Sequence, residues 1–187
     1  IPMDSMMDYA AIKPQDIKPA IEQLITQTRE AVNAAANSDL PPTWEAIIAP
    51  LDTVSEPLWR AWSVAGHLNT VVNTPELRDA YNAMLGPITE LATWIGLNEG
   101  LYHQYKRLHD SPEFATWTPT RKRVIELALR NFKLGGVELI GEDRTRYAEL
   151  SEQQSQVSQK FSENVMDAKD KWSLIIDDIK RLDGVPE

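Results

Sequence analysis

The chain has 187 residues, of which 42% are hydrophobic and 25% are charged, so it can bury a substantial core and does not have the composition of a disordered protein. Its 28 acidic and 19 basic residues give a net charge of −9, which repels nucleic acid and anionic membranes. It contains no cysteine, which excludes disulfides, thiolate metal sites and a cysteine nucleophile.

Apolar residues recur at spacings of three and four along most of the chain, as on one face of a helix. The first such segment spans residues 16–36, with Asp16 as its predicted N-terminal cap. The second begins after Thr43, which is predicted to cap it. Pro50 and Pro57 predict that this second helix kinks or splits.

The next helix starts are marked by residues that cap helices and by proline. Thr74-Pro75-Glu76 combines a cap, a proline at the first helical position and an acid in the first turn. Gly86-Pro87 predicts an interruption in the middle of that helix. Two further starts follow at Ser111-Pro112 and Thr118-Pro119, and Gly135-Gly136 is predicted to end the helix that begins at the second of them.

The last long helix is predicted from about Glu142 to Lys171, and nearly heptad spacing predicts one packed face. The residues expected on that face are Tyr147, Leu150, Gln154, Val157, Phe161, Asn164 or Val165, and Ala168. Residues 172–177 have the composition of a short strand, although no other segment is an obvious pairing partner. We therefore predict an all-α fold, an antiparallel helical array or bundle over residues 1–187, in which residues 172–187 begin a further element that includes one possible short strand.

Neither a membrane span nor a secretory signal is predicted. The chain has no run of the roughly 18 to 20 apolar residues that cross a bilayer, and no basic segment leads into an apolar run at its start. We therefore expect a cytoplasmic protein. The chain opens on Ile1-Pro2 rather than on an initiator methionine and ends just after a new element begins, so we expect a segment of a longer protein.

No motif predicts a catalytic, cofactor-binding or metal-binding residue. The His-Glu-x-x-His pattern, which places two zinc ligands one helical turn apart beside a general base, is absent. Of the three histidines, His67, His103 and His109, the last two lie six residues apart, on different faces of a helix. A surface or capping role is therefore favoured over metal ligation. The chain also lacks a Gly-x-Ser-x-Gly turn and a glycine-rich phosphate loop.

Three other groups have both a functional and a structural interpretation, and the structural one is favoured each time. Asp177-Asp178, or Asp167 with Asp170, could bind a cation, but in so acidic a chain solvated surface is more common. The basic run 121–123 (Arg-Lys-Arg) could bind phosphate or direct nuclear import, but it lies in the first turn of an ordinary helix. Six tryptophans could line a peptide groove, although tryptophan at helical spacing is more often part of a core: Trp44, Trp59, Trp62, Trp94, Trp117 and Trp172.

Five stretches carry a resemblance to a known family. The most specific is the 17-residue stretch 62–78, WSVAGHLNTVVNTPELR. The others are residues 11–14 (AIKP), 98–102 (NEGLY), 128–136 (ALRNFKLGG) and 161–168 (FSENVMDA). Together, and in this order, they resemble the N-terminal region of the oligopeptidase A / thimet oligopeptidase family, over about residues 8–177.

The resemblance implies a mostly helical zinc metallo-oligopeptidase, an endopeptidase of short peptides, whose two halves enclose a channel that excludes folded proteins. In that family the zinc ligands and the general base lie in a downstream His-Glu-x-x-His helix, followed by a glutamate ligand, and none of these is present here. The chain would then form one wall of the channel and part of its size filter, bind no zinc by itself and be inactive alone. Its implied partners are short peptides together with the missing catalytic half, or a second copy that covers the face left exposed.

Two alternatives stay open. A stand-alone helical interaction module predicts a stop codon directly after Glu187 and a polar surface on all sides. A small enzyme built on the chain's own acids and His67 predicts a turnover that is lost when His67 is replaced.

Overall fold

The computed structural model describes residues 8–185, which form helices and connecting loops with no strand. The helices are α1 (Pro14–Ala35), α2 (Trp44–Val71), α3 (Pro75–Gly96), α4 (Glu99–His109), α5 (Pro119–Leu134) and α6 (Gly141–Lys171), with short 3₁₀ helices η1 (Tyr9–Ala11), η2 (Pro112–Thr116) and η3 (Ile179–Leu182). The predicted all-α fold is confirmed.

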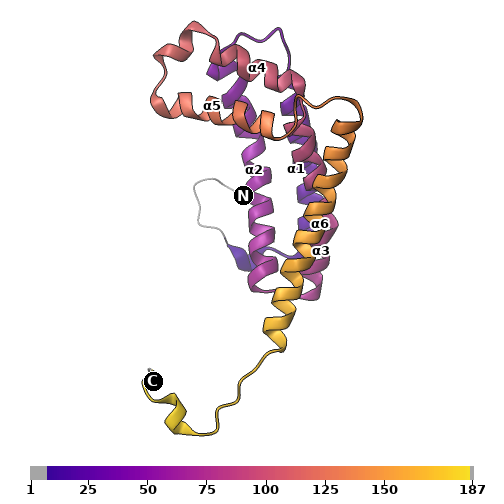
Figure 1. The fold of residues 1–187 in the computed structure, drawn as a ribbon, viewed down its shortest axis with the longest axis vertical. Helices are drawn as coiled ribbons and strands as arrows, with labels where there is room; N and C mark the ends of the chain where they lie inside the picture. The colour runs from indigo at the N-terminus through magenta and orange to yellow at the C-terminus, as the bar shows by residue number, and fades with distance from the viewer. Residues whose placement is uncertain (1–7, 186–187) are drawn as a thin grey trace.

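The helices are arranged as a long bundle with a smaller pair of helices at one end. Figure 1 shows α1, α2, α3 and α6 running along the long axis, and consecutive helices of the α1–α2–α3 series alternate in direction. Helices α4 and α5 pack against each other at the upper end of the view. Helix α6 returns along α3, which is the helix it contacts most.

Side-chain caps begin most of these helices, as predicted. Thr43 accepts a hydrogen bond from the Ala46 backbone N–H at 3.2 Å, and Thr74 and Thr118 cap α3 and α5 in the same way. The prediction for α1 was wrong by three residues, because the helix begins after Lys13. Asp16 lies inside its first turn, where the carboxylate accepts the Lys13 backbone N–H at 3.3 Å.

The prolines do not split the helices, so of the kink or split predicted at Pro50 and Pro57 the split is excluded, and the interruption predicted at Gly86-Pro87 does not occur. Helix α2 continues through Pro50 and Pro57, and α3 continues through Pro87. A proline inside a helix costs roughly 3 kcal/mol, because one backbone hydrogen bond is lost and the ring crowds the preceding turn. Leu58 and Ile88, the residues directly after two of these prolines, are buried in the core. Burial of the surrounding apolar side chains holds the helices together across each proline.

The core consists of two clusters that meet near the middle of the molecule. The lower cluster joins α1, α2 and α3, and the upper cluster joins α1 and α2 to α4 and α5. Trp94 and Ile95, near the end of α3, pack against both clusters. The long helices α1 and α2 therefore connect the two ends of the domain through continuous apolar packing.

Helix α6 has the predicted bounds to within one residue, but the predicted packed face is wrong. Leu150, Val157, Phe161 and Val165 are between 44% and 69% exposed. The side of α6 that faces α3 is instead polar, and its one fully buried side chain is that of Glu163. Heptad spacing locates an apolar stripe but does not show which surface covers it, and within residues 8–185 nothing covers this one.

The short strand predicted over residues 172–177 does not form. After Lys171 the chain leaves the helical body as an extended segment followed by η3 (Figure 1). A strand requires a neighbouring strand for its backbone hydrogen bonds, and residues 8–185 supply none here. Residues 186 and 187, the end of the element predicted over 172–187, lie outside the described residues.

Candidate functional site

Helices α3 and α6 are joined by a row of polar contacts, which we call the α3/α6 seam. Three of its contacts join the two helices directly: Arg78 Nη2 to Asp167 Oδ1 at 2.7 Å, Asn82 Nδ2 to Glu163 Oε1 at 2.6 Å, and Thr89 Oγ1 to Ser155 Oγ at 2.8 Å. At the end of this row, Arg144 Nη1 of α6 contacts Oε1 of Glu99, the first residue of α4, at 2.7 Å. Hydrogen bonds and ion pairs thus occupy positions at which a helix pair usually has apolar side chains.

The two carboxylates of the seam are held in their charged form. Glu163 is 7% exposed, and the hydrogen bond from Asn82, helped by one from Gln159, sets its pKa below the usual range of a glutamate. The hydrogen bond from Arg78 likewise lowers the pKa of Asp167, and Asp167 raises the pKa of Arg78. The contact between α3 and α6 therefore depends on ionised acids.

Because of the carboxylates in the seam, we expect the folded protein to lose stability in acid. A carboxyl whose pKa is lower in the folded than in the unfolded chain stabilises the fold above its unfolded pKa of about 4, and this contribution is lost as the pH falls through the folded pKa. We expect Glu163→Gln to flatten the fall in stability between pH 6 and pH 3, measured as the urea midpoint at each pH. Glu152→Gln, an exposed glutamate of the same helix, is the control and should keep the wild-type slope. Identical slopes in all three proteins would contradict this role of Glu163.

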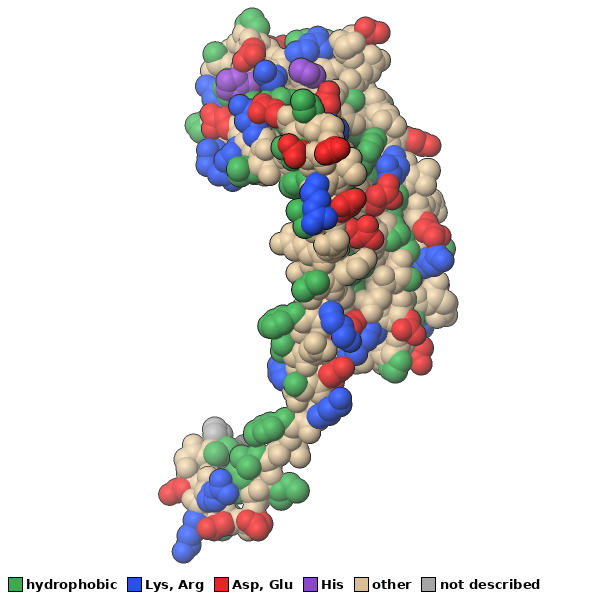
Figure 2. All heavy atoms as spheres, turned by 45° about the vertical axis from the view of Figure 1, so that its right-hand side comes forward, with side chains coloured by type: hydrophobic (Ala, Val, Ile, Leu, Met, Phe, Trp, Pro, Cys, Tyr) green, Lys and Arg blue, Asp and Glu red, His purple; other side chains and the backbone are tan. Residues whose placement is uncertain are grey.

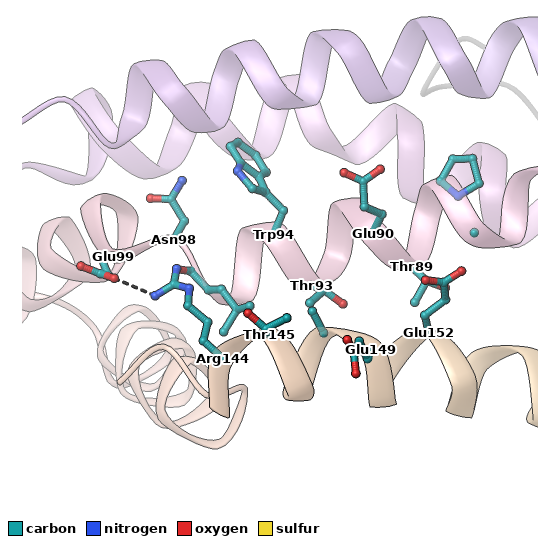
Figure 3. Close-up of a pocket in the computed structure, with 14 residues that line it drawn as sticks. Thr89, Glu90, Thr93, Trp94, Asn98, Glu99, Arg144, Thr145, Glu149 and Glu152 are labelled. Atoms are coloured by element: carbon teal, nitrogen blue, oxygen red, sulfur yellow. Dashed lines mark hydrogen bonds and ion pairs between the residues drawn. The ribbon is translucent and has the colours of Figure 1, made fainter. Parts of the chain in front are cut away.

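A hollow of about 880 Å³ lies beside the seam, between α3 and the first half of α6 (Figure 3). Figure 3 shows Arg144 extending from α6 to Glu99, and Trp94 and Glu90 lining the opposite wall. Arg29 pairs with Glu90 at 2.9 Å and lies over the Trp94 ring at 4.9 Å. The walls are rich in glutamate and contain no histidine or serine, so they offer charge and shape rather than a nucleophile with its base.

The three histidines have different neighbours. His67 is exposed on α2 and lies against the ring of Tyr9 in a tilted arrangement, with 5.3 Å between ring centroids. His103 is exposed on α4, and the Nδ1 of His109 lies 2.9 Å from a carboxylate oxygen of Asp110. Within residues 8–185 no group of three or more histidine, aspartate or glutamate side chains is arranged to hold a metal ion.

The acidic residues that were considered as possible cation ligands contact other residues of the chain. Asp167 pairs with Arg78, and Asp170 accepts a hydrogen bond from Asn73 at 3.3 Å, so both connect α6 to the start of α3. Asp170 is exposed, as the interpretation as solvated surface predicts, whereas Asp167 is partly buried. Asp178 accepts the backbone N–H of Lys180 and caps η3.

The basic run 121–123 is occupied by contacts within the chain. Arg121 lies over the Trp44 ring at 4.9 Å and 3.6 Å from Glu45, and Lys122 donates to the Ala115 carbonyl at 2.8 Å. Arg123 pairs with Glu126 at 3.5 Å on an exposed surface. These contacts tie the start of α5 to its neighbours.

The tryptophans are distributed over the domain rather than along one groove. Four are partly buried: Trp44 and Trp117 meet edge to face, Trp62 stacks on Tyr81 at 4.3 Å, and Trp94 joins the two cores. Trp59 and Trp172 are exposed. The core interpretation therefore holds for four of the six.

In residues 8–185, no helix is both long enough and apolar enough to span a membrane.

The chain is similar to peptidases. It is 37% identical to oligopeptidase A of Salmonella typhimurium over 98% of its own length and 27% of that protein, and 40% identical to oligopeptidase A of Haemophilus influenzae over 96% of its own length and 26% of that protein. It is also 24% identical to the dipeptidyl carboxypeptidase of Escherichia coli over 91% of its own length. The chain spans about a quarter of the length of these relatives.

A family model described as the N-terminal domain of neurolysin/thimet oligopeptidase matches residues 21–144, from α1 to the first turn of α6. The chain therefore belongs to the neurolysin/thimet oligopeptidase family, of which it represents the N-terminal domain. The resemblance stated from the sequence is confirmed.

Proposed function

We propose that this chain is the N-terminal helical domain of a zinc metallo-oligopeptidase that cleaves short peptides, and that it forms one wall of the substrate channel. The observation that carries the proposal is the family match over residues 21–144, combined with relatives named oligopeptidase A that are about four times as long. A location in the cytoplasm is part of the proposal, and a plant relative 27% identical to the chain is named as a probable cytosolic oligopeptidase A.

The packing of the domain supports a role in selecting substrates by size. A channel wall restricts entry only if it keeps its shape when a large molecule presses on it. Helices α1 and α2 pass through both apolar clusters, and Trp94 and Ile95 join these clusters near the middle. Such packing resists bending, because moving one end of the domain would disturb contacts along its whole length.

The residues of this domain do not fit a catalytic zinc site. Zinc in a peptidase needs three converging side-chain ligands and an open position for water, and residues 8–185 contain no such group. The ligands and the general base would come from the rest of the polypeptide. In this proposal the domain contributes shape and surface to catalysis, and no catalytic step is assigned to its side chains.

The proposal predicts that the 187-residue chain alone cleaves no peptide. We expect no hydrolysis of a quenched fluorescent nonapeptide, and no stoichiometric zinc after gel filtration, because the ligand set is absent. The complete protein, prepared in the same way, should retain zinc and cleave the nonapeptide. Hydrolysis that co-purifies with the 187-residue chain through a second column would contradict the prediction.

The reading frame of the source gene tests the parent enzyme directly. A frame that continues beyond the codon for Glu187 into a His-Glu-x-x-His sequence with a downstream glutamate supports the proposal. A stop codon at that point would overturn it, and the chain would then be a stand-alone helical interaction module.

A further inference from the structure

An apolar stripe on α6 is exposed along most of the helix. We call Leu150, Val157, Phe161 and Val165 the α6 stripe; Val157 and Phe161 are each 69% exposed. They recur at helical spacing on a side of α6 turned away from the seam, whose residues Ser155 and Glu163 contact α3. Solvent contact for four large apolar side chains in one row is costly, and such a row is typical of a surface that another chain segment covers.

The exposed apolar surface continues beyond the helix. Trp172, Leu174 and Ile175 follow directly after α6 and are between 56% and 85% exposed. Figures 1 and 2 show that this segment leaves the helical body, so that it has no neighbouring helix to cover it. Both the stripe and the segment are thus apolar surfaces that residues 8–185 leave uncovered.

A hollow beside the stripe provides room for an inserted side chain. Phe161 and Val165 line it from α6, and Gly66 and Asn69 line it from α2, around a volume of about 560 Å³. Asn69 is buried, and its side-chain oxygen has no hydrogen-bond partner in residues 8–185. This oxygen has almost no accessible surface, so the hollow itself offers room for an apolar side chain rather than a contact with Asn69.

The charges around the stripe distinguish between possible occupants. Between residues 150 and 169, the acids Glu163 and Asp167 are paired with α3, and Glu152 lines the other hollow beside α3. Lys160 lies 3.8 Å from Glu163, and Lys169 is exposed beside the stripe. A partner with acidic residues at the edge of an apolar face would complement this surface.

We infer that the α6 stripe, with residues 172–175, is the surface on which the remaining part of the peptidase polypeptide packs, through an apolar face edged by acidic side chains. The inference rests on the proposed function. The chain spans about a quarter of the relatives' length, so a complete protein of that size has a further three quarters available to cover the stripe.

Single cysteines test which surface is covered, because the 187-residue chain has no cysteine of its own. Phe161→Cys and Val157→Cys place a thiol in the stripe, and Gln156→Cys is the control, an exposed position next along the same helix but off the stripe. Each variant is made in the 187-residue chain and in the complete protein, with any native cysteines of the latter replaced. The measured quantity is the rate of reaction with a maleimide.

In the 187-residue chain all three thiols should react at similar rates. In the complete protein the thiols at 157 and 161 should react at least tenfold more slowly, while the thiol at 156 keeps its rate. Equal rates at all three positions in the complete protein would overturn the inference, as would protection in the isolated chain that grows with its concentration, which would identify a second copy as the occupant. Protection in a complete protein that lacks peptidase activity would uphold the inference and refute the proposed function.

Discussion

Replacement of Leu58 by alanine should lower the free energy of unfolding by about 3 kcal/mol. Leu58 is fully buried in the lower cluster, where α2 meets α1 and α3, and it follows directly after Pro57. Its truncation removes apolar contacts and leaves a cavity that the three surrounding helices cannot close without moving. The change is measured by urea unfolding of the purified chain at neutral pH.

Val54→Ala is the matched control for Leu58→Ala. Val54 lies one turn earlier on the same helix and is 36% exposed, so its truncation should cost less than about 1 kcal/mol. Similar losses in the two variants would show that the lower cluster does not depend on Leu58 in the way its burial indicates.

Replacement of Gln104 by leucine is expected to cost about 2 kcal/mol. Gln104 is buried on α4, where its amide N–H donates to the Asn37 carbonyl and its amide oxygen accepts from Arg107 at 2.7 Å. Leucine has a similar size but leaves the Asn37 carbonyl, in the loop between α1 and α2, without this donor. The loss of stability should lower the midpoint temperature of thermal unfolding.

His103→Leu is the control for Gln104→Leu, because His103 is the preceding residue and is exposed. Its replacement should change stability by less than about 0.5 kcal/mol. An unchanged midpoint would contradict the prediction and show that the Leu40 N–H, which donates to the same carbonyl at 3.3 Å, satisfies it without Gln104.

The sequence was sufficient to predict the helices wherever a local signal marks their ends. Thr43, Thr74 and Thr118 are recognisable caps because their side chains bond to backbone groups three residues away. A split at Pro50 and Pro57, one of the two predicted outcomes, does not occur, because the opposing contribution comes from side chains of other helices that no local pattern contains.

The side of α6 that packs could not be predicted from its own sequence. Its apolar residues repeat every three or four positions, and so do the polar residues that contact α3. The pairs Arg78–Asp167 and Asn82–Glu163 join residues more than 80 positions apart, so they became recognisable only once the two helices were known to be neighbours. The polar repeat that includes Ser155 and Glu163 was the available signal for the packed side.

The sequence has no recognisable catalytic motif, so its family had to be recognised from other residues. Residue spacing and composition did not predict any reaction. The family was recognised instead from stretches of particular residues, such as 62–78, and the family match then confirmed it. Residues that serve packing carry no signature of a particular reaction.

The seam between α3 and α6 also determines the registration of the last helix. Apolar surfaces can slide past each other by a fraction of a turn at little cost, whereas Arg78 with Asp167 and Asn82 with Glu163 match in one alignment only. A shift of α6 by a single residue along its axis, about 1.5 Å, would break both pairs together. The direction in which the chain leaves Lys171 is therefore fixed by hydrogen bonds made about one and two turns earlier, at Asp167 and Glu163.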